Sequence, residues 1–162
     1  MADVILICGM ICSGKSHYAR KLAKERNAVI LSCDEISADI FHHAEGERFD
    51  DIAADIKRYL HKIAARIAGT GGNVILDWGF WTRAERREVS EYYTVLGIPF
   101  EWHYIDISET EWRCNIGLRN KAVSAGKTSD FFVDDGLVTK FLSRFEIPER
   151  EEIDRWHEFK RE

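Results

Sequence analysis

The chain has 162 residues, 45% of them hydrophobic and 31% charged, and its formal net charge is -5. This length suits one domain, so we expect a single domain spanning residues 1–162. The acidic balance argues against a protein whose main partner is nucleic acid, although a local basic groove is compatible with it. No apolar run reaches the ~20 residues of a membrane helix, and the first residues lack the basic segment of a signal peptide. We therefore expect a cytoplasmic protein with no membrane partner.

Apolar runs alternate with helical periodicity along the first half of the chain. Residues 4–8 and 28–33 are continuous apolar runs, as in strands that are buried on both faces. Between them, apolar residues recur every fourth position, which predicts a helix over residues 15–26. A short helical stretch is expected over residues 35–43. A long amphipathic helix follows, and its apolar positions are Phe49, Ile52, Ile56, Leu60, Ile63 and Ile67.

The second half of the chain continues this alternation. Strands are expected over residues 73–77 and 100–107, and a capping pair starts the helix behind each of them. These pairs are Thr82 with Glu85 and Ser108 with Glu111. Two helical segments, residues 135–144 and 149–160, close the chain, and no fifth strand is expected. Strand–helix alternation of this kind predicts an α/β fold, a three-layer sandwich with a mostly parallel sheet.

The octapeptide between the first strand and the first helix reads GMICSGKS, which fits the phosphate-binding pattern G-x-x-x-x-G-K-[ST]. Glycines let the backbone wrap closely around a polyphosphate, and the following helix points its N-terminal dipole at the same anion. Lys15 would reach the β- and γ-phosphates of ATP, and the Ser16 hydroxyl would bind Mg²⁺. The expected nucleotide-binding residues of this P-loop are Gly9, Met10, Ile11, Cys12, Ser13, Gly14, Lys15 and Ser16.

Three of the expected strands end in aspartate, at Asp34, Asp77 and Asp106. Because parallel strands place ligands at their carboxyl ends, these side chains are expected beside the phosphate loop. Phosphoryl transfer needs a carboxylate that accepts the proton of the substrate hydroxyl, and others that hold Mg²⁺. We predict Asp34 as that base and Asp77 as the residue that holds Mg²⁺ or the substrate. The alternative for each aspartate is a helix cap or a turn residue, which we favour for Asp106.

Two arginines precede a polar stretch, residues 120–130, which contains a glycine and predicts a mobile loop. A mobile arginine can stabilise the negative charge that spreads over a phosphoryl group during its transfer. Arg119 adjoins the stretch and is the better candidate, with Arg113 as the second. We expect a lid over residues 119–135. Both arginines could instead lie on a solvated helix face.

An aromatic cluster, DWGFW, begins at the end of the third expected strand. Its members Trp78, Phe80 and Trp81 could stack on a flat substrate, with Trp78 as the predicted contact, or could belong to the core, which we favour. His42 and His43 are interpreted as surface or packing residues, not as ligands.

Together these features resemble a family of small P-loop kinases. The resemblance rests on the phosphate loop, an aspartate after the second strand, the run VILDWGF, and a helix reading R-x5-R-N before a loop. The family includes chloramphenicol phosphotransferase, gluconate and shikimate kinases, the kinase domain of polynucleotide kinase, and zeta toxins. The chain is most similar to bacterial ATP-binding proteins of the zeta-toxin and polynucleotide-kinase-like set, some of which also carry a late F-E-x-P segment. The likeness covers residues 4–150 and implies a nucleoside- and shikimate-kinase-like fold with a lid after the fourth strand.

By that resemblance, Lys15 and Ser16 carry the phosphate and the metal, Asp34 is the catalytic aspartate, and an arginine near Arg119 is the lid arginine. The sequence departs from the family in two places. The usual fifth strand is not evident, and residues 37–51, where such kinases build the substrate site, match no member of the family well enough to name a substrate.

These features predict an enzyme that uses ATP and Mg²⁺ to phosphorylate a hydroxyl group of a small molecule. One alternative is a kinase for the 5′-hydroxyl of nucleic acid. Such an enzyme should carry basic residues around its substrate mouth, yet residues 34–55 are strongly acidic. The other alternative is a nucleotide-binding regulatory module that hydrolyses ATP slowly and has no acceptor.

Overall fold

A parallel sheet organises the chain. In the residues that the computed structural model describes, 3–43 and 46–162, five strands pair in the order β2-β3-β1-β4-β5. The strands are β1 (Val4–Gly9), β2 (Ala28–Leu31), β3 (Asn73–Asp77), β4 (Phe100–Asp106) and β5 (Arg155–Glu158). The helices are α1 (Lys15–Arg26), α2 (Cys33–Asp39), α3 (Phe49–Gly69), α4 (Arg83–Leu96), α5 (Glu109–Ser124) and α6 (Asp135–Arg144), with the short 3₁₀ helices η1 (Gly46–Arg48) and η2 (Arg150–Glu152).

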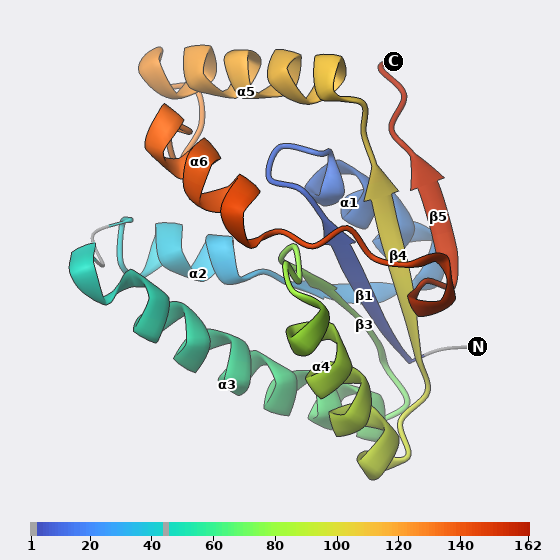
Figure 1. Cartoon of the computed structure of the whole chain (residues 1–162). Coiled ribbons are helices and arrows are strands. Elements are labelled where there is room, and N and C mark those ends of the chain that lie inside the picture. The colour runs from blue at the N-terminus through green and yellow to red at the C-terminus, as the bar shows by residue number, and fades with distance from the viewer. Residues whose placement is uncertain (1–2, 44–45) are drawn as a thin grey trace.

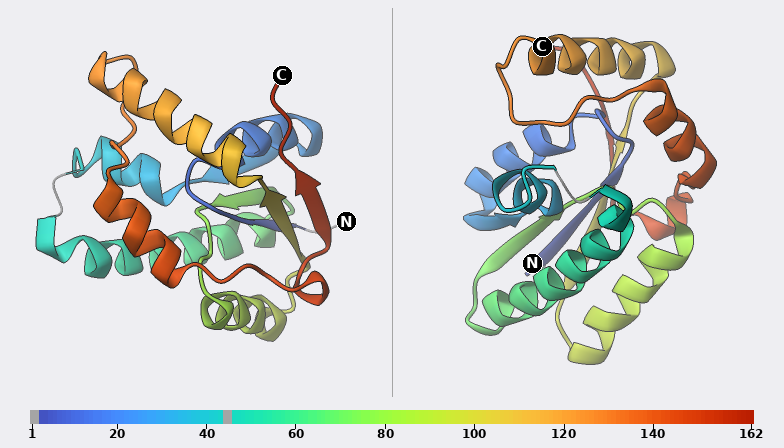
Figure 2. Two further views of the ribbon diagram at one scale, coloured as in Figure 1. Left: turned by 45° about the horizontal axis from the view of Figure 1, so that its top comes forward. Right: turned by 90° about the vertical axis from the view of Figure 1, so that its left-hand side faces the viewer.

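The side chains of β1 alternate between two cores, because successive residues of a strand point to opposite faces of the sheet. Leu6 belongs to the larger core, which includes side chains of α3 and α4. Ile5 and Ile7 belong to a smaller core with side chains of α1. Helices therefore cover both faces of the sheet (Figure 2), and the predicted three-layer α/β sandwich is confirmed.

All strands run in the same direction, so their carboxyl ends meet at one edge of the sheet. At this edge β1 leads into the loop before α1, β2 leads into α2, and β3 ends at Asp77. Both α5 and α6 lie beyond the same edge (Figure 1). The segments that carry the predicted site residues thus reach one region of the molecule.

The prediction of a helix over residues 149–160, with no fifth strand, is wrong. Arg155–Glu158 is the edge strand β5, which pairs with β4. Just before it, the Asp154 N–H donates to the Trp102 carbonyl of β4 at 2.9 Å. The Trp156 ring packs on Tyr104 of β4, with 4.6 Å between ring centroids. Pairing and packing against the open edge of β4 override the helical propensity of the charged residues in this segment.

The first half of each predicted capping pair is confirmed. Thr82 caps α4 and Ser108 caps α5, and each side-chain oxygen accepts the backbone N–H of the glutamate three residues later. The glutamate side chains bind other partners, Glu85 accepting from Lys57 and Glu111 from Arg161. α5 continues to Ser124, so the first part of the stretch predicted as a loop, residues 120–130, is helical instead. In the described part of the chain, no helix is both long enough and apolar enough to span a membrane.

The helical stretch predicted over residues 35–43 begins and ends earlier than expected. The helix starts two residues sooner because the Ser32 side chain caps it, with its oxygen 3.3 Å from the Glu35 nitrogen. It ends before His42 and His43, whose φ angles of 52° and 55° are left-handed and exclude them from a right-handed helix.

Candidate active site

The phosphate loop joins β1 to α1 in a conformation suited to an anion. Gly14 precedes the first helical residue with a φ of 91°, and no side chain among the described residues caps α1. Cys12 also has a left-handed φ, of 56°. Lys15 curls back over the loop, and its Nζ donates to the Met10 carbonyl at 2.5 Å. A helix start whose N–H groups have no side-chain cap, with a lysine ammonium beside it, is a site for a polyphosphate.

Helix α5 holds the outer side of this loop. The Trp112 indole N–H donates to the Ile11 carbonyl at 2.6 Å, and the Asn115 amide donates to the Cys12 carbonyl at 2.8 Å. Neither side chain was predicted from the sequence to take part in the site. A signal was present, because Trp112, Asn115 and Arg119 are spaced three and four residues apart, which places them on one face of a helix.

Lysine, serine and two aspartates converge beside the loop. Asp77 is only 6% exposed. Burial raises the pKa of its carboxyl group, whereas the Lys15 ammonium and a hydrogen bond with the Ser16 side chain lower it. Burial in turn lowers the pKa of Lys15, and the negative charges of Asp77 and Asp34 oppose that shift. These charges therefore lie close enough to act on one another.

The two other predicted aspartates have different surroundings. Asp34 is exposed on the first turn of α2. The cap of that helix is Ser32, so the alternative role of Asp34 as a helix cap is wrong. Asp106 joins β4 to the end of the chain: its carboxylate accepts the Trp156 indole N–H at 3.0 Å, and its carbonyl accepts the Phe159 N–H at 2.7 Å. These contacts are structural, but they differ from the helix cap or turn that we favoured for Asp106, since Ser108 caps the helix that follows.

Ser16 and Asp77 together offer oxygen ligands of the kind that Mg²⁺ prefers. Their hydroxyl and carboxylate groups lie beside the phosphate loop, near enough for the Ser16 side chain to lower the pKa of Asp77. Mg²⁺ is commonly held by one or two carboxylates together with waters and the phosphates of a substrate. In the described residues, no group of three or more His, Cys, Asp and Glu side chains could hold a metal without such help. The donor set fits a Mg²⁺ ion that binds together with a nucleotide.

The two predicted arginines lie in different environments on α5. Arg119 is close enough to the phosphate loop for its charge to act on Cys12 and on Lys15. Arg113 instead pairs with Glu109, one turn earlier on the same helix, at 3.4 Å, and 57% of its side chain is exposed. Of the two, Arg119 is the one that the structure brings to the site.

The segment after α5, where we predicted a lid, is held at its ends by side chains of that helix. The Asn120 side chain makes two hydrogen bonds of 2.8 Å with the backbone of Val133. The Arg119 guanidinium lies 3.9 Å from the Asp130 carboxylate and 5.6 Å from the centroid of the Phe131 ring. The segment is therefore docked beside the arginine that faces the phosphate loop.

His43 connects the segment after α2 to this lid. We had interpreted His43 as a surface or packing residue, and this link was not predicted. Its Nε2 lies 2.7 Å from the Ser129 carbonyl oxygen, and its ring packs edge-on against Phe131. Its Nδ1 lies 3.3 Å from the Ser37 hydroxyl. The tautomer with the proton on Nε2 satisfies both contacts, since that nitrogen donates to the carbonyl and Nδ1 accepts from the hydroxyl.

The aromatic cluster lies mostly in the core. Trp78 is 6% exposed and Phe80 is 0% exposed, and their ring centroids lie 5.0 Å apart. Trp81 is partly exposed and packs on Phe141 of α6. A buried indole presents no open face for stacking, so the predicted contact of Trp78 with a substrate would require this part of the core to open.

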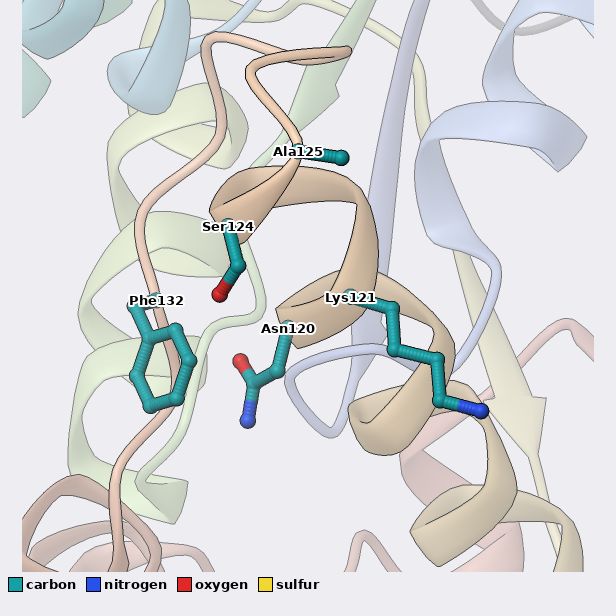
Figure 3. Close-up of a pocket in the computed structure, with 5 residues that line it drawn as sticks. All are labelled: Asn120, Lys121, Ser124, Ala125 and Phe132. Carbon is teal, nitrogen blue, oxygen red and sulfur yellow. The ribbon is translucent and has the colours of Figure 1, made fainter.

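Two surface depressions lie beside α5. The larger, of about 470 Å³, is lined by Asn120, Lys121, Ser124, Ala125 and Phe132. Figure 3 shows Asn120 and Ser124 turned toward the Phe132 ring, whereas Lys121 extends away from it. The other, of about 220 Å³, is lined by Met10, Ile107, Glu109, Trp112, Arg113 and Leu142. Neither is lined by the lysine and aspartates that converge at the phosphate loop.

Solved structures share this fold over nearly the whole chain. A sugar kinase from Janibacter sp. HTCC2649 is 17% identical, with a TM-score of 0.68 over 98% of this chain and 86% of that one. A gluconokinase from Sinorhizobium meliloti 1021 is 16% identical, with a TM-score of 0.67 over 96% and 80%. The APS kinase CysC of Mycobacterium tuberculosis, in complex with AMPPNP and APS, is 18% identical, with a TM-score of 0.70 over 99% and 90%. At these identities the likeness shows a common P-loop kinase-like fold.

Sequence comparison adds a curated relative and a family. The Arabidopsis thaliana protein named "Protein KTI12 homolog" is 29% identical over 160 residues, which are 94% of this chain and 49% of the relative. The chain thus spans about half the length of that relative. Residues 4–148 match the family described as "AAA domain". With its P-loop fold and a family match over most of its length, the chain belongs to this AAA-domain family.

Proposed function

We propose that the protein is an ATP-dependent phosphotransferase that moves the γ-phosphoryl group of ATP to a hydroxyl group of a small molecule. The observation that carries this proposal is the convergence of Lys15, Ser16, Asp77 and Asp34 at the carboxyl edge of the sheet. A phosphate-binding loop alone would serve any nucleotide-binding protein. An exposed carboxylate beside it adds the proton acceptor that transfer to a hydroxyl requires.

Each group has a distinct task in this reaction. The loop N–H groups and Lys15 bind the β- and γ-phosphates, and Ser16 and Asp77 hold Mg²⁺. The metal supplies positive charge that offsets the charge of the phosphates. The acceptor oxygen bonds to the γ-phosphorus as the bond to the β–γ bridging oxygen breaks, and ADP leaves. Asp34 takes the proton of the acceptor hydroxyl.

The lid completes the site. Arg119 adds a positive charge near the phosphoryl group as negative charge develops on it. Docking of the lid beside Arg119 limits the access of water, which would otherwise compete with the acceptor. A cytoplasmic location remains part of this proposal.

The acceptor is proposed to be small because of the charge around Asp34. Residues 34–55 are strongly acidic, and a nucleic acid would be repelled there by its own phosphates. For this reason we propose a small-molecule kinase in preference to a kinase for the 5′-hydroxyl of nucleic acid. The finer resemblance to zeta toxins, polynucleotide kinase and chloramphenicol phosphotransferase stays a prediction.

A second candidate is a nucleotide-binding regulatory ATPase without an acceptor. It is kept as a candidate because the curated relative, 29% identical over 94% of this chain, is named "Protein KTI12 homolog", whereas the kinases are 16–18% identical and share the fold. A regulatory ATPase would use the same phosphate loop and metal ligands but would have no need of Asp34 as a base.

A transfer screen separates these candidates. The protein is incubated with Mg²⁺ and ATP labelled on the γ-phosphate, together with pools of sugars, nucleosides and antibiotics, or with a DNA oligomer that carries a 5′-hydroxyl. Label that moves to a small-molecule pool, and is lost in Asp34→Asn, supports the proposal. Label on the oligomer would support the nucleic-acid kinase. Release of phosphate alone, equal in wild type and Asp34→Asn, would overturn the kinase and leave the regulatory ATPase.

A further inference from the structure

The chain turns sharply just after Asp77. The Phe80 N–H donates to the Trp78 carbonyl at 2.5 Å, two residues back, which is the hydrogen bond of a γ-turn. Gly79 at its centre has a φ of 70°, and a Cβ at that position would lie 2.7 Å from the Trp81 indole nitrogen. Phe80 follows with a φ of 49°, a left-handed conformation that phenylalanine adopts only where its surroundings impose it.

Contacts from two elements, β1 and α4, hold this turn in place. The Gly79 carbonyl accepts the N–H of Gly9, the first glycine of the phosphate loop, at 3.1 Å. The Phe80 carbonyl accepts a hydrogen bond from the Arg86 guanidinium at 2.9 Å and faces the Cys8 thiol at 3.6 Å. The strained turn is therefore the direct link between the carboxyl end of β3 and the start of the phosphate loop.

Arg86 lies deep in the protein for a charged residue, with 2% of its side chain exposed. Its Nε donates to Glu152 in η2 at 2.9 Å, while its Nη1 donates to Phe80 on the other side. A buried ion pair is weak evidence for stability, because removing two charges from water offsets much of their attraction. The planar fork of arginine, which reaches two partners at fixed angles, points to a role in geometry.

We propose that Arg86 is a positioning residue for the metal half of the site: by fixing the Phe80 carbonyl it holds the turn that sets the Asp77 carboxylate against Ser16. This inference rests on the proposed function, in which Ser16 and Asp77 hold Mg²⁺. Groups that orient a metal ligand without touching the metal have large effects on its affinity. The phosphate loop itself has a separate support, because Trp112 and Asn115 of α5 hold its backbone without help from Arg86. Loss of Arg86 should therefore weaken the response to Mg²⁺ more than the binding of the bare nucleotide.

The test compares binding of AMPPNP, a non-hydrolysable ATP analogue, with Mg²⁺ and with EDTA, by calorimetry. The ratio of the two affinities is the gain due to Mg²⁺. In Arg86→Met the hydrogen bond to Phe80 is lost while side-chain length is kept, and the gain should fall by about 10-fold or more. Affinity in EDTA should stay close to that of wild type.

Two controls separate geometry from stability. Glu152→Gln removes the negative charge of the ion pair but leaves Arg86 bonded to Phe80. Arg83→Met removes the other arginine that lies near Glu152, at 3.9 Å, without touching the turn. Both should lower the thermal unfolding midpoint while keeping the gain due to Mg²⁺. An undiminished gain in Arg86→Met, or an equal loss in Glu152→Gln, would overturn the positioning role.

If Arg86→Met does not fold, the double variant Arg86→Met with Glu152→Leu takes its place, because it leaves no unpaired buried charge. This variant also lacks the hydrogen bond to Phe80, so a folded double variant with a wild-type gain overturns the role as well. Absence of any Mg²⁺-linked gain in the wild-type protein would overturn the metal site itself, and the positioning role with it. If Mg²⁺ raises the AMPPNP affinity of Arg86→Met as much as that of wild type, the positioning role is overturned and the metal site stands.

Discussion

The phosphate half of the site and the acceptor half are built in different ways. In the phosphate half, two side chains of α5 hold the backbone of the loop: the buried Trp112 donates to the Ile11 carbonyl, and the half-buried Asn115 donates to the Cys12 carbonyl. Backbone atoms have few degrees of freedom, so a loop held in this way keeps one shape. This half is ready for a polyphosphate before any ligand arrives.

The acceptor half depends on exposed side chains that meet across loops. Asp50, at the start of α3, pairs with Lys140 at 3.1 Å and with Arg144 at 3.4 Å, both from α6. Side-chain exposures of 36% to 59% mark these as surface ion pairs, which contribute little to stability. Such contacts can open at small energetic cost, so this half can adjust to an acceptor. Under the proposed function, a preformed shape would recognise ATP, whereas a surface that can rearrange would recognise the acceptor.

The largest effect is expected in the phosphate half, from Lys15→Ala. This change removes the cation that faces the β- and γ-phosphates, so both ATP binding and turnover should be lost. The fold should survive, because the ammonium contacts the loop and is not packed among apolar side chains. Calorimetry with AMPPNP and Mg²⁺, together with thermal unfolding, measures the two outcomes. Lys21→Ala, an exposed position on the same helix, is the matched control; wild-type affinity in Lys15→Ala would refute the phosphate-loop assignment.

The next largest effect should come from the acceptor half, in Asp34→Asn. The amide has nearly the same shape but cannot accept a proton, so kcat should fall by roughly 10²–10⁴ while ATP affinity is kept. Steady-state kinetics with an acceptor from the transfer screen measures this. Glu35→Gln, an exposed acid next along α2, should have little effect. Near-normal turnover in Asp34→Asn would move the base elsewhere, with Asp77 as the next candidate.

A smaller effect is expected at the arginine between the two halves. Arg119→Ala should lower kcat by about 10²–10³, as for the loss of one group that stabilises transition-state charge, with less effect on ATP affinity. Arg113→Ala should be neutral, since Arg113 pairs with Glu109 in solvent. Measuring kcat and nucleotide affinity for both variants distinguishes them. If Arg113→Ala lowered kcat and Arg119→Ala did not, the lid would stand and Arg113 would be its arginine. If neither variant lowered kcat, α5 would have only a structural role.

The smallest effect concerns the contact between His43 and the lid. His43→Ala removes the hydrogen bond to the Ser129 carbonyl, so amide hydrogen exchange across residues 120–130 should quicken in the protein without nucleotide. AMPPNP with Mg²⁺ should slow that exchange in wild type. His42→Ala, at the exposed neighbouring position, is the control. If hydrogen exchange across residues 120–130 were equal with and without nucleotide, the segment would not act as a lid.

Features that depend on neighbouring residues were predictable from the sequence. The phosphate loop is one such case, because eight consecutive residues contain the glycines, the lysine and the hydroxyl that a polyphosphate requires. The caps at Thr82 and Ser108 are others, since each hydrogen bond spans three residues. Apolar runs identified β1 and β3 for a similar reason: a strand buried on both faces needs apolar residues at every position.

Other features exist only where distant segments meet. β5 reads as a helix in isolation and becomes a strand because the open edge of β4 is there to pair with it. Trp112 and Ile11 are separated by 101 positions in the chain, so no local pattern announces their hydrogen bond. The sequence ranked Arg119 above Arg113 only because Arg119 adjoins the polar stretch. The packing of α5 against the phosphate loop brings the charge of Arg119 close enough to act on Lys15 and leaves Arg113 in solvent. Adjacent residues therefore determine the phosphate-binding chemistry. Long-range packing decides which arginine approaches the phosphate loop and how Arg86 fixes the position of Asp77.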